Sequence, residues 1–393
     1  MCRKLLNVLL LSGMYLFGVM VPLVLPVHAE IHTTTSQGLW LSIPDVKQLP
    51  MSGPAWDNLK QHADAVLGPA DIKDQKSQHN INALAVSLVY ARMADKVDPS
   101  VSDSYRKKAA DAILAAIGTE SGTRSLALGR NIAAYVIAAD LINLADYNAN
   151  DDAQFKAWLK DLIRNINGEG RSVITCHNIR PNNWGTMCGA SRIAVDLYLD
   201  DAQDLAEAIK VFKGYSGDRM AWDKFKFARD ATSFMCDPNN PRPMNPEGCM
   251  KDGHNMSGSP VDDIQRAGPY DSTQWFESGY ANHTNYAWGG FSGAVAQAEL
   301  LHRAGYAAYE WQDRAMFRGA HFLDNIVKFA LSNPTEWVPW VLNFRYGTDF
   351  TTETPVGMGR LIGWGDWTHG SGRSPSADTL PPQPPKGLRI IQY

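Results

Sequence analysis

Residues 277–306 read ESGYANHTNYAWGGFSGAVAQAELLHRAGY and divide into two halves of different character. In the second half, apolar residues recur at the spacing of one face of an α-helix. These residues are Phe291, Ala294, Val295, Ala298 and Leu301. Gly305 follows the run and is placed to end the helix. We therefore expect a buried helix over residues 291–303.

The first half of the same stretch crowds polar and aromatic side chains in front of that helix. They are Glu277, Tyr280, Asn282, His283, Asn285, Tyr286 and Trp288. Histidine and tyrosine can transfer protons, and asparagine can hydrogen-bond a carboxylate. A rigid helix is a suitable element for aiming such groups into a cleft. Packing of aromatic rings with satisfied polar tips is the alternative interpretation for any single residue.

Helical periodicity extends outward from this stretch over most of the chain. Residues 151–166 show it best, because Phe155, Trp158, Leu159, Leu162 and Ile163 form one apolar stripe. We expect further helices at residues 54–67, 81–94, 105–117, 126–144, 192–199, 202–212 and 309–330. Strand signals are scarce. The sequence therefore predicts an all-α fold of antiparallel helix pairs in one array.

Two breaks, residues 168–186 and 216–288, interrupt the helices and are long enough to predict functional loops. They also contain or closely border the four cysteines that follow residue 29. Of the three possible connectivities we expect the sequence-local one, Cys176–Cys188 and Cys236–Cys249. A zinc site using His177 or His254 is the alternative, but spacings of 12 and 13 do not resemble a CxxC pair.

Both ends of the chain differ from its middle. Residues 1–29 have a basic start, an apolar run and a small-residue exit, which predicts a cleaved signal peptide; an uncleaved membrane anchor is the alternative. Residues 371–393 are mostly rich in Ser and Pro and read as a tail. We therefore expect one domain over residues 30–370, exported to the periplasm or secreted, without stable membrane insertion.

The net charge excludes a broadly basic nucleic-acid-binding protein. It is −4 for the whole chain, and cleavage after residue 29 would remove Arg3 and Lys4 and leave −6. A polyanionic substrate would therefore need a local basic patch on the protein. Nothing in the sequence indicates a metal or another cofactor.

Several short motifs resemble the alginate lyase superfamily. Residues 182–185, NNWG, resemble the start of a helix in these enzymes, and residues 282–288, NHTNYAW, are similar to the segment that holds the catalytic tyrosine. ESG at 277–279 followed by His283-Thr284, and GWGDWTH at 363–369, add to the resemblance, which covers most of residues 80–370. It implies an (α/α) toroid or incomplete barrel that cleaves uronic-acid polymers by β-elimination.

The resemblance also implies roles for individual residues. Asn182, Asn183 and Arg266 would neutralise the substrate carboxylate. His283 and Tyr286, or Tyr280, would supply the base and the acid, with His283 favoured as the base. Independently of the resemblance, Trp184, Trp364 and Trp367 would line the sugar cleft, because aromatic faces stack on sugar rings. The chain departs from the classical pattern twice: Trp184 replaces a histidine after the asparagine pair, and His283 falls where the catalytic tyrosine would be. The substrate, whether mannuronan, glucuronan or another anionic polysaccharide, is left open.

Alternative interpretations exist for these residues and for the activity. Either asparagine can cap the following helix, and the two tryptophans near the C-terminus can close the barrel. An (α/α)-toroid glycoside hydrolase would need two opposed carboxylates, for which Asp262, Asp263, Glu277 and Asp366 are available. A non-catalytic polysaccharide-binding protein is the third possibility, favoured by the missing histidine.

Overall fold

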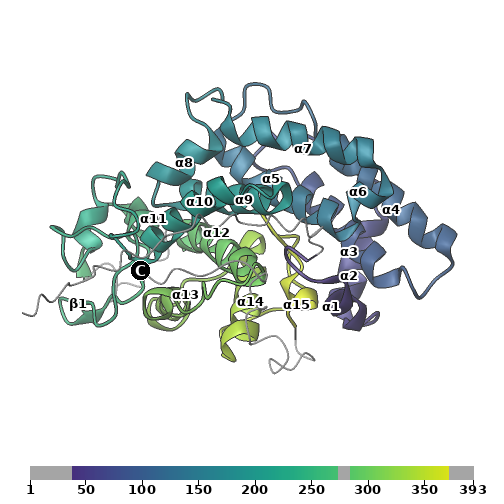
Figure 1. Ribbon diagram of the computed structural model, residues 1–393. Coiled ribbons are helices and arrows are strands. Elements are labelled where there is room, and N and C mark those ends of the chain that lie inside the picture. Colours follow the sequence, from purple (N-terminus) through teal and green to yellow (C-terminus); the bar gives the residue numbers. More distant parts are fainter. Residues whose placement is uncertain (1–37, 273–283, 371–393) are drawn as a thin grey trace, which may run out of the picture.

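The computed structural model describes residues 38–272 and 284–370, which form helices and almost no strand (Figure 1). The α-helices before the long break are α1 (Ile43–Gln48), α2 (Pro54–Asp64), α3 (His79–Met93), α4 (Pro99–Leu114), α5 (Ser125–Leu141), α6 (Leu144–Tyr147), α7 (Ala149–Arg164), α8 (Val173–Ile179), α9 (Asn183–Leu199) and α10 (Ala202–Ser216). Those after residue 217 are α11 (Val261–Ile264), α12 (Thr284–Arg303), α13 (Trp311–His321), α14 (Trp337–Tyr346) and α15 (Gly365–Thr368). The predicted all-α fold class is confirmed.

Short elements occupy the described part of the long break and the connections near the C-terminus. They are the 3-10 helices η1 (Ala231–Phe234), η2 (Gln265–Ala267) and η5 (Asn333–Thr335), the π-helical turn η4 (Phe322–Ile326), and an antiparallel pair of strands, β1 (Met250–Lys251) and β2 (His254–Asn255). The break therefore has little regular structure over residues 217–272, as its composition predicts.

Local sequence explains helix α7 well. The Asn148 side chain caps its N-terminus by accepting hydrogen bonds from the backbone N–H groups of Asn150 and Asp151. Its apolar stripe is buried, with Phe155 and Leu159 fully inaccessible to solvent. The helix thus begins and ends within two residues of the prediction.

Helix α9 lies between α5 and α12 and packs closely against both. Gly129 on α5 makes one approach possible, because a Cβ atom there would lie 2.8 Å from the backbone nitrogen of Cys188. Gly293 on α12 makes the other, because a Cβ atom there would lie 2.6 Å from the nitrogen of Met187. These two glycines fix α9 in the middle of the fold, with Asn183 as its first helical residue.

Successive contacts between helices lead around the molecule and return to the start. Helix α2 packs on α3, α3 on α5, α5 on α9, α9 on α12, α12 on α14, α14 on α15, and α15 on α2. Figure 1 shows α5, α7 and α9 above α12 to α15, with α1 to α3 at the right side. This order is compatible with the predicted toroid of helices.

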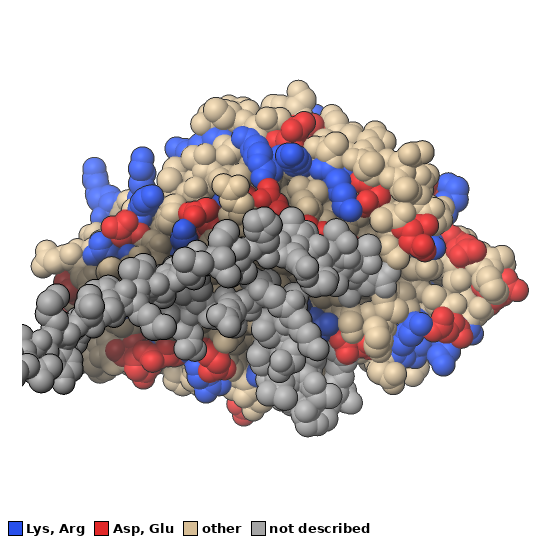
Figure 2. Space-filling model, viewed as in Figure 1, with Lys and Arg blue, Asp and Glu red and all other residues tan. Residues whose placement is uncertain are grey.

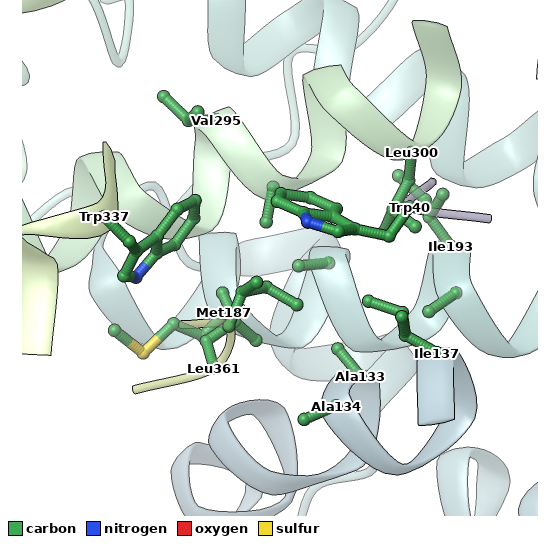
Figure 3. Close-up of a cluster of buried hydrophobic side chains, with 14 of the residues drawn as sticks. Trp40, Ala133, Ala134, Ile137, Met187, Ile193, Val295, Leu300, Trp337 and Leu361 are labelled. Carbon is green, nitrogen blue, oxygen red and sulfur yellow. The ribbon is translucent and has the colours of Figure 1, made fainter. Parts of the chain in front are cut away.

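The interior of this arrangement is filled by hydrophobic side chains. Figure 3 shows Trp40, which precedes α1, among side chains of α5, α9 and α12, with Trp337 of α14 nearby. Trp40 also contacts Trp337 and His369 edge-on, at ring-centroid distances of 5.9 and 5.6 Å. The two ends of the described fold therefore meet in its core.

One buried charged group joins the last helices. Glu299 on α12 accepts hydrogen bonds from Arg345 Nε on α14 and from the Tyr309 hydroxyl, both at 2.8 Å. His369 Nε2 lies 3.6 Å from the same carboxylate. Both oxygens of Glu299 have partners, as burial of a carboxylate requires.

Some expected elements differ from the structure. The first predicted loop, residues 168–186, contains α8, and residues 337–346 form α14, which the sequence did not indicate. The predicted helix 309–330 is shorter, because it passes into the π-helical turn at Phe322 and ends by Ile326. No helix among the described residues combines the length and apolarity that crossing a bilayer requires.

One of the two predicted disulfides is confirmed. Cys236 and Cys249 are bonded and join the segment after η1 to the residue before β1. The prediction for Cys176 and Cys188 is wrong for this structure, because both are buried free thiols. The Cys188 thiol instead donates to the backbone carbonyl of Ser125 at 3.3 Å, so the packed interface of α8 and α9 accommodates the reduced pair.

Candidate active site

A cavity of about 570 Å³ opens where the N-terminal turns of α9 and α12 meet the start of α5. Its walls also include the connection before α3, η2, and residues near η5. The lining residues are Gln75, Lys76, Arg124, Leu126, Arg130, Asn183, Trp184, Met187, Arg266, Tyr286, Gly289, Ser292, Ser332, Pro334, Thr335 and Arg360. Five of them are Lys or Arg and, among these described residues, none is Asp or Glu.

The adjacent residues Asn182 and Asn183 have different surroundings. Asn182 is the N-cap of α9: its Oδ1 accepts from the Trp184 backbone N–H at 3.1 Å, and its Nδ2 donates to Asp262 at 2.7 Å. Both ends of its amide are therefore occupied, and it does not line the cavity. The expectation that Asn182 binds substrate is wrong in this geometry, and the alternative of helix capping is correct.

Asn183 does line the cavity and is held by two partners. Its backbone N–H donates to Asp263 Oδ1 at 3.0 Å, and its side-chain Oδ1 accepts from Arg266 Nη2 at 3.3 Å. Because Arg266 occupies the amide oxygen of Asn183, the amide nitrogen Nδ2 is the side-chain polar atom without a described partner. Asn183 thus has a donor for a ligand oxygen.

Asp263 supports this arrangement, although it does not itself line the cavity. Burial raises its pKa well above the usual range, although the Asn183 backbone N–H and the charge of Arg266 oppose that shift. Its Oδ2 lies against Gly290 of α12, where any Cβ atom would overlap it. Gly290 is therefore required for Asp263 and Asn183 to occupy these positions.

Arg266 and Tyr286 form the next part of the wall. The guanidinium carbon of Arg266 lies 4.8 Å from the centroid of the Tyr286 ring, at the distance of a cation–π contact. Arg266 Nη2 is also 4.0 Å from Asp263 Oδ1, and its Nε is buried without a hydrogen-bond partner among the described residues. The structure therefore brings together Asn183, Arg266 and Tyr286, three of the residues expected in one cleft.

Sequence reasoning missed the remaining cations of the cavity. Lys76, Arg124, Arg130 and Arg360 come from three separate parts of the chain. Arg130 is partly buried, and burial together with the charge of Arg360 lowers its pKa to about 10. Arg130 is therefore still protonated at neutral pH. Only the overall need for a local basic patch was visible in the sequence.

The three tryptophans expected to line the cleft lie in different surroundings. Trp184 lines the cavity, and the Arg180 guanidinium lies 5.7 Å from its ring centroid. Trp364 and Trp367 are buried, and their indole N–H groups donate to the backbone carbonyls of Ile81 and Pro50. The expectation of a cleft role for these two is wrong: they pack the end of the chain against α2 and α3 and close the ring of helices.

The remaining candidate site residues either lie outside the described residues or do not line the cavity. His283, Tyr280 and Glu277 lie outside the described residues. Asp262 and Asp366 are buried and accept hydrogen bonds from backbone N–H groups, and neither lines the cavity. In the described part of the chain, no three His, Cys, Asp or Glu residues form a group suited to a metal ion.

Charges of both signs are interspersed on the visible face outside the grey region, as Figure 2 shows. The cavity differs, since its described lining carries cations without a carboxylate. It also receives the N-terminal turns of α9 and α12, and the positive end of each helix dipole favours anions. Cationic side chains and helix dipoles therefore both favour binding of an anionic ligand here.

Residues 88–221 match the model of the family described as alginate lyase. The matched segment runs from α3 to just beyond α10 and includes Arg124, Arg130, Asn183 and Trp184 of the cavity. None of the curated proteins matches the chain.

Proposed function

Because residues 88–221 place this chain in the alginate lyase superfamily, we propose that it cleaves a uronic-acid-containing polysaccharide by β-elimination. The observation that carries the proposal is the cavity, where Asn183, Arg266 and Tyr286 contact one another and the rest of the lining supplies four further Lys and Arg side chains. An anionic polymer is the ligand class that such a lining favours. The fold by itself would not decide the activity.

β-Elimination needs three functions from the protein. The substrate carboxylate must be neutralised so that the C5 proton becomes acidic, a base must remove this proton, and an acid must protonate the glycosidic oxygen on C4. The C4–O bond then breaks and a C4–C5 double bond forms. The reaction consumes no water and needs no second carboxylate from the protein.

We assign the first function to Asn183 and Arg266. Asn183 Nδ2 can donate to one carboxylate oxygen, and the guanidinium of Arg266 can face the other. The hydrogen bond between these two side chains holds the donors in place before substrate binds. Preorganised donors of this kind stabilise the charge that develops in the transition state.

Tyr286 is the proposed acid, because a tyrosine hydroxyl is ordinarily protonated at neutral pH and this side chain lines the cavity with 37% of its surface accessible to solvent. The roles of Tyr286 and His283 would exchange if the neighbouring Arg266 stabilised the deprotonated tyrosine. His283 remains the proposed base from the sequence argument, since its unperturbed pKa of about 6.5 suits proton removal near neutral pH. The positively charged Arg266 is not a candidate for either proton transfer.

Export of the protein is part of the same proposal. The Cys236–Cys249 disulfide supports an oxidising compartment such as the periplasm or the outside of the cell. An extracellular location would give the enzyme access to a polymer that is too large to enter the cytoplasm.

The test is a screen of the purified chain on mannuronan, glucuronan and other uronate polymers. The expected result is ultraviolet absorbance from the new double bond, with a fall in turnover of about 10²–10⁴ for Tyr286→Phe or His283→Ala. Tyr270→Phe is the matched control, since Tyr270 also contacts a cation, Lys251, but does not line the cavity.

Two outcomes would overturn the proposal. New reducing ends without the absorbance would indicate a hydrolase, and binding of the polymers without any cleavage would indicate a non-catalytic binding protein. Normal turnover in a folded Tyr286→Phe variant would remove Tyr286 from the mechanism.

A further inference from the structure

Arg130 and Arg360 form a second cationic wall in the cavity, apart from Arg266. Arg130 lies on α5, whereas Arg360 lies on the connection between α14 and α15. Both side chains are partly buried, and no described carboxylate lies within ion-pair distance of either guanidinium. Two like charges at one site, without a counter-charge, destabilise the empty protein.

Neutral groups hold Arg130 in this unfavourable position. Its Nε lies 3.4 Å from Met187 Sδ, and its Nη1 lies 3.4 Å from both the backbone carbonyl and the side-chain Oε1 of Gln75. These weak contacts orient the guanidinium but do not compensate its charge. The charge of Arg360 is close enough to lower the pKa of Arg130, whereas the pKa of Arg360 is lowered by burial.

The pair also adjoins the proposed reaction centre. Tyr286 lies near enough to Arg130 to influence its pKa electrostatically, in the direction that favours the charged guanidinium. Met187, which contacts Arg130, is on the same helix as Asn183. A sugar ring whose carboxylate is bound by Asn183 and Arg266 would therefore have its neighbour in the chain beside Arg130 and Arg360.

We propose that Arg130 and Arg360 bind the carboxylate of the sugar next to the one that reacts, and so determine the specificity of the enzyme. This inference rests on the proposed lyase function. An arginine fork matches a carboxylate in geometry and charge, and a carboxylate between the two guanidinium groups would remove their repulsion. Lys76 and Arg124, both exposed at the rim, would attract the polymer from solution.

The assignment predicts that replacing either arginine weakens substrate binding and has little effect on the rate of the chemical step. Arg360→Gln and Arg130→Gln should each raise KM for a contiguous uronate polymer by roughly 10–100-fold, the usual range for a charged hydrogen bond, and should change kcat by only a few fold. KM for a polymer in which glucuronate alternates with a neutral sugar should change little. Arg360→Lys should restore part of the loss, because it restores the charge.

A binding measurement separates this inference from the proposed lyase function. Titration calorimetry should show that a mannuronate trimer binds the unmodified protein more tightly than the same trimer with its carboxyl groups reduced. Arg360→Gln should remove part of this difference, and Asn183 and Arg266 should account for the remainder. Arg219→Gln is the matched control, because Arg219 bonds Asn240 outside the cavity. This result would support the subsite even if the polymer screen gave no unsaturated product.

Other results would overturn the inference. If Arg360→Gln bound the acidic trimer as tightly as the unmodified protein, the subsite would not exist. If the variants lowered kcat with KM unchanged, or lost affinity equally for the acidic and the reduced trimer, Arg130 and Arg360 would have a structural role. Thermal unfolding of each variant identifies any that fail to fold. If Arg130→Gln fails to fold, the result with Arg360→Gln decides whether the subsite exists, because Arg360 lies outside the helices and its replacement does not disturb one.

Discussion

Replacement of Arg345 by methionine would test whether the buried charge cluster holds the ring of helices together. Arg345 and Glu299 are at most 4% exposed, and the arginine makes two contacts with the carboxylate through Nε and Nη2. Removing one partner of such a pair leaves an uncompensated buried charge, which costs about 3–5 kcal/mol. For a domain of this size the expected fall in Tm is roughly 4–7 °C.

The destabilisation caused by Arg345→Met should depend on pH. Burial alone would raise the pKa of Glu299, but the charge and hydrogen bonds of Arg345, together with His369, hold it well below its usual value. A depressed carboxyl pKa contributes stability that is present above the unfolded-state value, about 4.3, and is lost as pH falls below it. In the variant the pKa is no longer held down, and protonation of Glu299 at acidic pH relieves the uncompensated charge.

Urea unfolding of both proteins between pH 4.5 and 8 would measure this effect. The difference in the free energy of unfolding should be largest near pH 8 and should shrink toward pH 4.5. Arg314→Met is the matched control, since that side chain is 45% exposed and its loss should cost less than about 1 kcal/mol. A loss below about 1 kcal/mol for Arg345→Met, or one independent of pH, would refute the role of the cluster.

Three further changes have defined outcomes. Gly290→Ala places a Cβ atom against Asp263, so it should destabilise the fold by about 1–3 kcal/mol in urea unfolding and reduce lyase turnover. Burial and neighbouring acids raise the pKa of Asp196 to about 9, so the unmodified protein loses stability as pH rises from the pKa of an unfolded-state aspartate toward 9. Asp196→Asn should remove this loss, which amounts to at most about 1.4 kcal/mol per pH unit. Loss of the Cys236–Cys249 disulfide, by substitution of both residues with serine, should cost about 3 kcal/mol in thermal or urea unfolding.

Each of these three has its own contradicting result. Gly289→Ala is the control for the stability effect of the first, since a Cβ atom at Gly289 would meet nothing within 4 Å. Equal destabilisation by the two variants would exclude the proposed clash. An unchanged pH profile in Asp196→Asn would mean that Asp196 does not titrate as described. A double serine variant as stable as the parent would show that the disulfide does not restrain the unfolded chain.

The sequence predicted the structural features that depend on local periodicity, but fewer of those that depend on residues distant in the chain. Helix α7 was located to within two residues because its cap and its apolar stripe are both local. Helix α8 was missed because seven residues give too little periodicity. The different roles of Asn182 and Asn183 are decided by Asp262 and Asp263, which are brought there only by folding.

The basic lining of the cavity shows the same limit. Tyr286 was found because it stands in the NHTNYAW motif, and Arg266 because it lies in the long loop before that motif. Arg130 and Arg360 stand in unrelated stretches, and single arginines of this kind are usually solvated surface groups. Only the closed arrangement of the helices places them in one wall, without a neighbouring acid among the described residues.

The meeting of Trp40 with His369 has a consequence for the order in which the helices follow one another along the chain. Since the two ends of the described fold lie in contact, a short linker from residue 370 to residue 38 would make the polypeptide continuous. New termini could then be opened at an exposed connection, such as Gly118–Gly122 between α4 and α5. A circular permutant of this kind should keep both the ring and its cavity, because the contacts around the ring depend on which helices are neighbours in space and not on which helix is first in the chain.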